Sequence, residues 1–105
     1  LNNSLRLAFP EDIAAMKLAA ITNRGSKKDF VDLYFLLKQF SLAEMLNFYN
    51  NKYHDGSEYL VVKSLTYFED AEKDQPLKMI KPVEWKDVKT TIQKEVLKYH
   101  DQLKK

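Results

Sequence analysis

One lysine stands inside an otherwise apolar run of the chain. Within residues 13–21 the only polar side chain is Lys17, so on a helix its ammonium emerges among apolar neighbours whichever face is buried. A buried ammonium is costly unless an anion pairs with it. Asp32 and Lys17 are equidistant from the turn at residues 24–25. Because residues equidistant from the turn of an antiparallel helical hairpin tend to lie side by side, we predict a Lys17–Asp32 pair between two helices.

Such a pair fits two kinds of role. In a catalytic or substrate-binding pair, Lys17 would contact phosphate as a point charge, and Asp32 would orient the lysine or accept a proton. In a structural pair, the two charges would only tie two helices together. Asp29 lies on nearly the same side of its helix as Asp32, so the two carboxylates could hold a cation, although Asp29 also fits a helix-capping role.

Two further charged clusters could either bind a ligand or simply be exposed to solvent. Arg24, Lys27 and Lys28 crowd the start of a helix, where backbone N–H groups and basic side chains can receive phosphate, and where a solvated loop is the plainer alternative. An acidic stretch over residues 69–74 could bind a metal or a basic partner, or simply be exposed to solvent. His54 and His100 have no neighbour with ligand-like spacing, so we predict no metal site from them.

The elements that must position these residues follow from helix start signals and helical spacing. Pro10, followed by two acids, begins the first helix, and Ser26, Ser41, Ser57 and Pro82 begin the others. The expected helices cover residues 10–22, 26–39, 41–55, 57–66 and 82–103, with a long loop over residues 68–81. Residues 59–62 are β-branched enough for a strand to be an alternative. We therefore predict an all-α bundle of about five helices.

The first residues differ from the rest. Leu5, Leu7 and Phe9 alternate with other residues, as in a half-buried strand, but nothing in the sequence offers this segment a partner strand. We expect residues 1–9 to be the remnant of an upstream strand or linker, and residues 10–105 to form one helical domain. Because the chain begins with Leu1, we also expect it to be a piece of a longer protein.

Composition limits the classes of function. The 105 residues include no cysteine and two glycines, and the formal net charge is +2. Disulfides, thiolate metal sites, a cysteine nucleophile and a glycine-rich phosphate loop are therefore excluded. The charge is too small to indicate or to exclude a nucleic-acid partner. No apolar run is long enough to span a bilayer, so we expect a cytoplasmic protein without a membrane partner.

Three segments together resemble a known family. Residues 11–21, Arg24 with residues 28–34, and residues 64–72 look like the C-terminal half of the AbiEii/AbiGii nucleotidyltransferase toxins. The resemblance implies an N-terminal catalytic domain, carrying a glycine-serine motif and two metal-binding aspartates, that is missing from this chain. It also implies that Lys17 and Asp32 are catalytic, and that Lys17, Arg24 and Asp29 take part in nucleotide binding.

The function implied by this resemblance is the transfer of a nucleotide from a nucleoside triphosphate (NTP), with Mg²⁺, to an acceptor such as transfer RNA. A separate antitoxin protein would regulate such a toxin, as part of a toxin-antitoxin or abortive-infection system. Without the N-terminal domain and its carboxylates we expect the chain to be inactive. The alternative is a non-enzymatic helical module that recruits a protein partner and never contacts a nucleotide.

Overall fold

The structure, a computed structural model, describes residues 9–74 and 84–103. These residues form helices and no strand, so the all-α prediction is confirmed, with five helices of eight or more residues and one short helical turn. The strand-like segment before Phe9 lies outside the described residues. The helices are α1 (Pro10–Arg24), α2 (Lys27–Leu36), α3 (Leu42–Lys52), α4 (Glu58–Leu65), α5 (Glu69–Glu72) and α6 (Trp85–Leu103).

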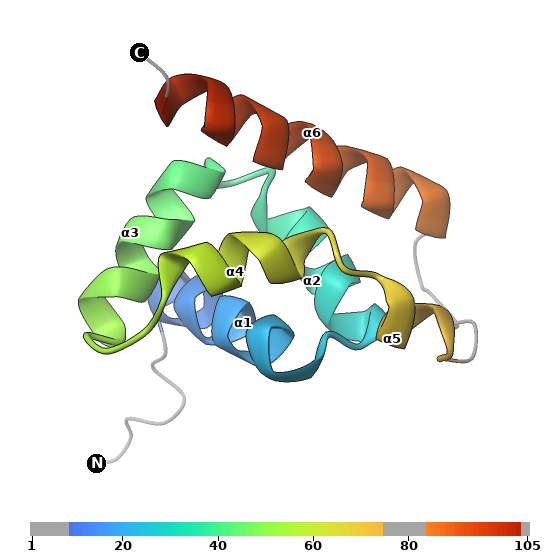
Figure 1. The fold of residues 1–105 in the computed structure, drawn as a ribbon, viewed down its shortest axis with the longest axis horizontal. Helices are drawn as coiled ribbons and strands as arrows, with labels where there is room; N and C mark the ends of the chain where they lie inside the picture. The colour runs from blue at the N-terminus through green and yellow to red at the C-terminus, as the bar shows by residue number, and fades with distance from the viewer. Residues whose placement is uncertain (1–8, 75–83, 104–105) are drawn as a thin grey trace.

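Helix α1 packs against one side of α2, α3 and α4. Helix α6 runs across the other side of α2, α3 and α4, as the long red helix in Figure 1 shows. The helices enclose one apolar core, to which each of them contributes at least one buried side chain. Its largest fully buried members are Phe30, Leu18, Leu33, Met45, Leu46, Leu65 and Ile92.

Helices α1 to α4 begin where the sequence predicts, whereas α6 begins at Trp85 and not at the predicted Pro82, since Glu84 is not helical. Pro10 is the first residue of α1, and the side chains of Ser26, Ser41 and Ser57 each accept a hydrogen bond from the backbone N–H three residues later. At Ser41 the reciprocal bond to Glu44 completes a capping box. The strand alternative for residues 59–62 is wrong, because the Ser57 cap starts a helix whose apolar face is buried in the core.

The helix ends and the expected loop need correction. Helix α2 ends at Leu36, before the expected residue 39, because the N–H groups of Lys38 and Gln39 bond to carbonyls only three residues back. Helix α3 ends at Lys52. The long loop expected over residues 68–81 is wrong for Glu69–Glu72, which forms α5, and its small residue Ala71 is fully buried. The expected helix start at Pro82 and residues 75–81 lie outside the described residues.

An aromatic cluster ties three helices to the turn that follows α1. The ring of Phe30, on α2, packs edge-on against Phe68 at 5.0 Å and against Trp85 at 6.0 Å between ring centroids. A side chain on Gly25 would meet this cluster, since a Cβ atom there would lie 2.6 Å from the Phe30 ring. Glycine therefore allows the turn between α1 and α2 to pack closely on the core.

In the described part of the chain, no helix combines the length and the apolar character needed to cross a bilayer.

Candidate functional site

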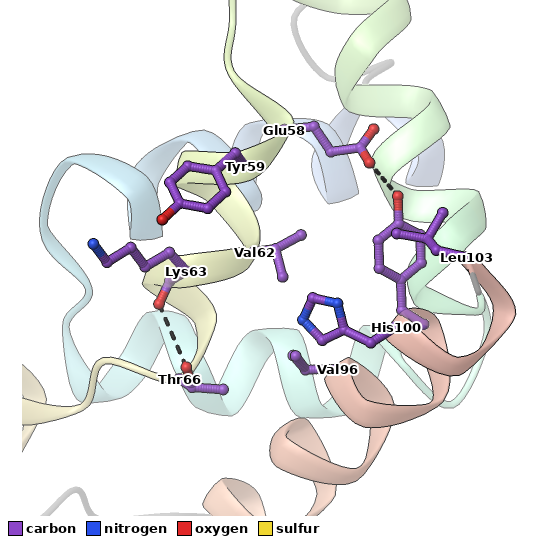
Figure 2. Close-up of a pocket in the computed structure, with 9 residues that line it drawn as sticks. Glu58, Tyr59, Val62, Lys63, Thr66, Val96, His100 and Leu103 are labelled. Atoms are coloured by element: carbon purple, nitrogen blue, oxygen red, sulfur yellow. Dashed lines mark hydrogen bonds between the residues drawn. The ribbon is translucent and has the colours of Figure 1, made fainter.

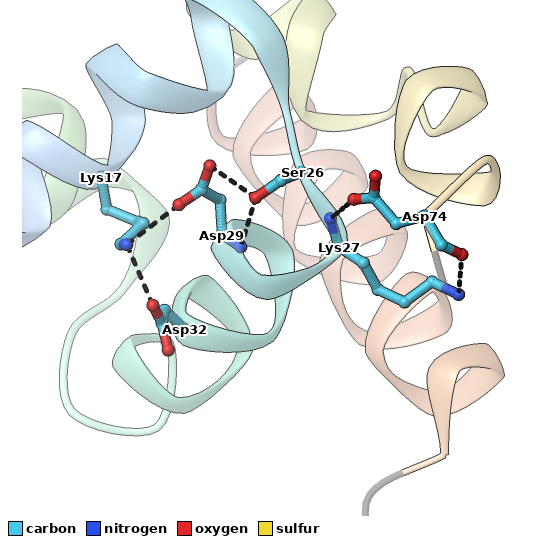
Figure 3. A network of polar contacts seen from close by, with 6 residues as sticks. All are labelled: Lys17, Ser26, Lys27, Asp29, Asp32 and Asp74. Carbon is cyan, nitrogen blue, oxygen red and sulfur yellow. Dashed lines mark hydrogen bonds and ion pairs between the residues drawn. The ribbon is translucent and has the colours of Figure 1, made fainter. Parts of the chain in front are cut away.

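The Lys17 ammonium lies between two carboxylates of α2. Its Nζ atom is 2.9 Å from Asp32 Oδ2 and 3.1 Å from Asp29 Oδ1 (Figure 3). The structure therefore has the predicted contact between Lys17 and Asp32 and adds Asp29 to it. We call these three residues the Lys17 cluster. Lys17 and Asp29 are largely buried, with 19% and 21% of their side chains exposed, whereas Asp32 is 41% exposed.

Ser26 holds one member of the cluster in place. Its hydroxyl donates to Asp29 Oδ2 at 2.9 Å and accepts from the Asp29 backbone N–H at 3.2 Å. The residue that caps α2 thus also orients the carboxylate of Asp29 toward Lys17. Asp32 has no such support from Ser26, so Asp29 is the fixed carboxylate of the cluster and Asp32 is the open one. The sequence predicts Ser26 as a helix cap, but it gives no sign that the Ser26 hydroxyl also orients the carboxylate of Asp29.

The pKa values reflect this mutual stabilisation. Burial by itself would lower the pKa of Lys17, but the hydrogen bonds and charges of Asp32 and Asp29 outweigh burial and raise the pKa above 10.5. Burial would likewise raise the pKa of Asp29, but hydrogen bonds from Ser26 and Lys17 outweigh it and lower the pKa below 3.8. Near neutral pH the lysine and Asp29 are therefore both charged.

The cluster has limited but definite chemical capacity. An ammonium has three hydrogen-bond donors, and Lys17 uses two of them on Asp29 and Asp32, so one remains for a phosphate oxygen. One oxygen of Asp32 is in the ion pair, and the other can accept from a hydroxyl group. With two carboxylates and one ammonium, the cluster has a formal charge of −1. It is therefore suited to orienting a hydroxyl and a phosphate, and the main neutralisation of a triphosphate must come from other groups.

These carboxylates do not fit a metal in the described structure. The ammonium of Lys17 lies between Asp29 and Asp32, where a cation held by both carboxylates would otherwise be placed. Among residues 9–74 and 84–103, no three His, Cys, Asp or Glu side chains are grouped to hold a metal ion.

The basic residues of the turn are divided between different roles. Lys27 is engaged, because its backbone N–H donates to Asp74 Oδ2 at 2.7 Å and its ammonium lies 5.3 Å from the centroid of the Trp85 ring. The carboxylate of Asp74 thus occupies the start of α2, where phosphate was expected as one alternative. Lys28 is exposed. Arg24 forms no ion pair with the Lys17 cluster and instead lines a cleft against α4.

Two acids of residues 69–74 are structural. Glu72 accepts hydrogen bonds from Trp85 Nε1 at 3.0 Å and from Lys89 Nζ at 2.6 Å, and these donors hold its pKa below the ordinary value. Asp74 accepts from Lys27 as described above. Glu72 is exposed, as the plainer alternative expects, and Asp74 is half-buried, but both also have a structural role, because they join α5 and its following turn to α6 and α2.

A cleft between α4 and α6 contains no residue of the Lys17 cluster. Its volume is about 430 Å³, and Figure 2 shows apolar side chains such as Val62 and Leu103 on its walls. At one end the Tyr99 hydroxyl donates to Glu58, and burial together with this carboxylate raises the pKa of Tyr99 to about 12. His100, to which the sequence assigns no role, also lines this cleft. Periodicity alone places these side chains on helix faces but cannot predict the cleft.

An exposed apolar strip runs along α1 beside the Lys17 cluster. Phe9 is 65% exposed, Ile13 is 41% exposed and Met16 is 48% exposed. Their spacing of four and then three residues places them on one side of the helix. Met16 precedes Lys17 directly, and Ile13 lies one turn before it. We call these three residues the α1 strip.

Comparison with known proteins gives two matches. The model of a family described as "Nucleotidyl transferase AbiEii toxin, Type IV TA system" matches residues 3–103. A protein of Aquifex aeolicus (strain VF5) named "Uncharacterized protein aq_aa25" is 40% identical over 102 residues, which are 93% of this chain and 48% of that protein. The chain therefore spans about half the length of this curated relative. No solved structure matches the chain.

Proposed function

The chain belongs to the AbiEii nucleotidyl transferase toxin family, and from this premise we propose that it is the helical C-terminal part of a nucleotidyltransferase. The Lys17 cluster is its contribution to the active site. The observation that carries the proposal is the position of Lys17, which is held by two carboxylates of α2 and, among the described residues, has no third hydrogen-bond partner for its ammonium. Residues 10–105 are the helical domain, and the reaction requires an N-terminal catalytic domain that this chain lacks.

Each member of the cluster has a separate task in this proposal. Asp29, fixed by Ser26, positions the lysine. The remaining N–H of the Lys17 ammonium donates a hydrogen bond to a phosphate oxygen of the bound NTP and stabilises charge that develops there. Asp32, the open carboxylate, accepts a hydrogen bond from the attacking hydroxyl and can take its proton, while the hydroxyl oxygen bonds to the α-phosphorus of the NTP and pyrophosphate leaves. Such positioning and charge stabilisation are the main contributions that proteins make to phosphoryl chemistry.

The NTP and Mg²⁺ belong with the missing domain. Bound Mg²⁺ would neutralise the triphosphate, and Asp29 and Asp32 do not fit it because both already bind the Lys17 ammonium. Because the cluster has a net charge of −1, it cannot neutralise the triphosphate by itself, which also places this task in the other domain. We therefore expect the chain alone to be inactive, although its residues complete the site.

The α1 strip supports an interface with the missing domain. Three large apolar side chains are exposed in a row next to Lys17, and covering them would bring a second surface up to the cluster. An active site formed at such an interface would exclude water from the reacting groups. The N-terminal catalytic domain is the partner that fits this position.

The wider role proposed here follows the family. The acceptor is an RNA such as transfer RNA, and the protein acts as a cytoplasmic toxin of a toxin-antitoxin or abortive-infection system with a cognate antitoxin. The family description supports the toxin and its system.

The test is reconstitution of transfer. The chain is joined to, or mixed with, an N-terminal nucleotidyltransferase domain of this family and incubated with a labelled NTP, Mg²⁺ and transfer RNA. Label should enter RNA only when both parts are present, and Lys17→Ala or Asp32→Ala should abolish the transfer. Full activity of both variants would refute the assignment of the site.

A second candidate function is a non-enzymatic protein-interaction module, and the α1 strip favours it as much as it favours the enzyme. A scaffold does not need the Lys17 cluster, since a structural ion pair can often be replaced by apolar residues without loss of the fold. If Lys17→Met with Asp32→Leu keeps the fold and partner binding, and no reconstituted mixture transfers a nucleotide, the module is the better account.

A further inference from the structure

A second, more polar cleft lies between the turn that follows α1 and helix α4. Its volume is about 290 Å³. Small-molecule sites usually have volumes of about 300–1,000 Å³, so this cleft lies at the lower end of that range. We take it to have room for about one nucleotide. Its polar wall residues are Asn23, Arg24, Lys63, Ser64, Tyr67 and Asp70.

Two cations line this cleft from different elements. Arg24 ends α1, and Lys63 lies on α4; both side chains are exposed. In the described part of the chain, neither has an acidic group within ion-pair distance. The ammonium of Lys63 is 5.8 Å from the centroid of the Tyr59 ring, a contact that does not neutralise its charge. A planar guanidinium and an ammonium that lack anionic partners can together bind a phosphate group.

The same cleft offers groups that suit a nucleobase. The ring of Tyr67 is 53% exposed, and a flat exposed ring is a surface on which a base can stack. The charge of Glu69, desolvation and the charge of Asp70 raise the pKa of Tyr67, so the ring carries no charge that would oppose stacking near neutral pH. Asp70 is half-buried, and its carboxylate can accept from the amino group of a base.

We propose that this cleft is a nucleoside-phosphate site, with the phosphate between Arg24 and Lys63, the base on Tyr67, and Asp70 accepting from the base. The proposal rests on the proposed function in one respect, because it takes the nucleotide to be part of the acceptor RNA or the NTP of that reaction. Arg24 follows Lys17 by two helical turns, so the Cα atoms of the two residues are separated by about 10 Å along α1. The cleft therefore lies within reach of a nucleotide chain that also contacts the Lys17 cluster.

The experiment measures binding to the full chain without any transfer. Fluorescence anisotropy is recorded with two probes, a labelled single-stranded RNA of eight nucleotides and a fluorescent ATP. The variants are Arg24→Gln with Lys63→Gln, and Tyr67→Leu. The matched control is Lys86→Gln with Lys94→Gln, which removes the same number of charges from exposed positions of α6.

At least one probe should bind the wild-type chain and the control equally well. The Arg24/Lys63 double variant should bind it at least tenfold more weakly, and Tyr67→Leu about tenfold more weakly, the loss expected when a stacking surface is removed. If the RNA is the ligand, the slope of log affinity against log salt should also fall by about 0.7 in the double variant, since the two cations neutralise one phosphate and each phosphate contact contributes about 0.7. Binding of ATP alone would identify the NTP as the source of the nucleotide.

Two results would overturn the proposal. One is that neither probe binds the wild-type chain, and the other is that the double variant binds as tightly as the control. Because this measurement involves no transfer, a failure of transfer in the reconstituted enzyme would leave it unaffected.

Discussion

Replacing Lys17 with methionine removes the cation of the Lys17 cluster and keeps most of its apolar stem. The two carboxylates, which lie 2.9 and 3.1 Å from the ammonium, then have no cation between them, and Asp29 keeps only its hydrogen bond from Ser26. Exposed ion pairs contribute about 0–1 kcal/mol, and breaking a fully buried pair costs about 3–5 kcal/mol. Because Lys17 and Asp29 are about four-fifths buried, we expect Lys17→Met to lower the free energy of unfolding by about 1–3 kcal/mol.

The two carboxylates should contribute unequally to this decrease in the free energy of unfolding. Asp29 is 21% exposed and held by Ser26, whereas Asp32 is 41% exposed. In double-mutant cycles we expect a coupling of Lys17 with Asp29 of about 1–2 kcal/mol and a coupling with Asp32 below about 1 kcal/mol. The Asp29→Asn and Asp32→Asn variants complete the two cycles.

The assay is urea unfolding at constant salt, evaluated by linear extrapolation. Lys89→Met is the matched control, because the Lys89–Glu72 pair is also made between helices but is 30% and 44% exposed. Its loss should be below about 1 kcal/mol. Couplings of Lys17 to both aspartates that are no larger than experimental error would refute the reasoning from burial and geometry.

The pH dependence follows from the directions of the two pKa shifts. The pKa of Lys17 is raised, so its stabilisation is fully present below 10.5 and is lost as the pH rises through the folded pKa. The pKa of Asp29 is lowered, so its stabilisation is present above 3.8 and is lost as the pH falls through the folded pKa. The difference in stability between the wild type and Lys17→Met should thus be constant near neutral pH and shrink at both extremes.

Three further predictions concern the parts of the fold around the sites. Gly25→Ala should lower the free energy of unfolding by about 1–3 kcal/mol in urea, because its Cβ would lie 2.6 Å from the Phe30 ring, and unchanged stability would contradict this packing. Ser26→Ala should cost about 1 kcal/mol in the same assay, since it removes the cap of α2, and a neutral result would show that the cap is dispensable. In a spectrophotometric titration Tyr99 should ionise at about pH 12, and Glu58→Gln should move that step toward pH 10; no movement would mean that Glu58 does not act on it.

The helices and the pairing across the first hairpin were predictable because both depend on local rules. Serine caps and Pro10 mark helix starts within a few residues, and equal distances from a short turn bring Lys17 and Asp32 together. The second carboxylate of the pair was only partly predictable. Asp29 was recognised as lying on the side of Asp32 and as a capping residue, but its contact with Lys17 depends on the close packing of α1 and α2.

The remaining features depend on contacts between distant segments. Glu72 binds Trp85 and Lys89 across 13 and 17 positions, and no sequence periodicity links an acidic stretch to a later helix. Helix α5 has four residues, which is too short for helical spacing to appear in the sequence. The two clefts beside α4 depend on where α1 and α6 lie, so their lining residues could not be grouped from the sequence.

The central claim, that the Lys17 cluster takes part in nucleotide transfer, is tested most directly by the rate of labelled nucleotide transfer to RNA per folded molecule. The measurement compares Lys17→Met with the matched control Lys89→Met in the reconstituted protein, after the folded fraction of each has been determined. We predict that Lys17→Met slows transfer at least about 100-fold, as expected for loss of a group that stabilises developing charge, and that Lys89→Met leaves the rate near that of the wild type. Equal rates for the two variants would contradict the account.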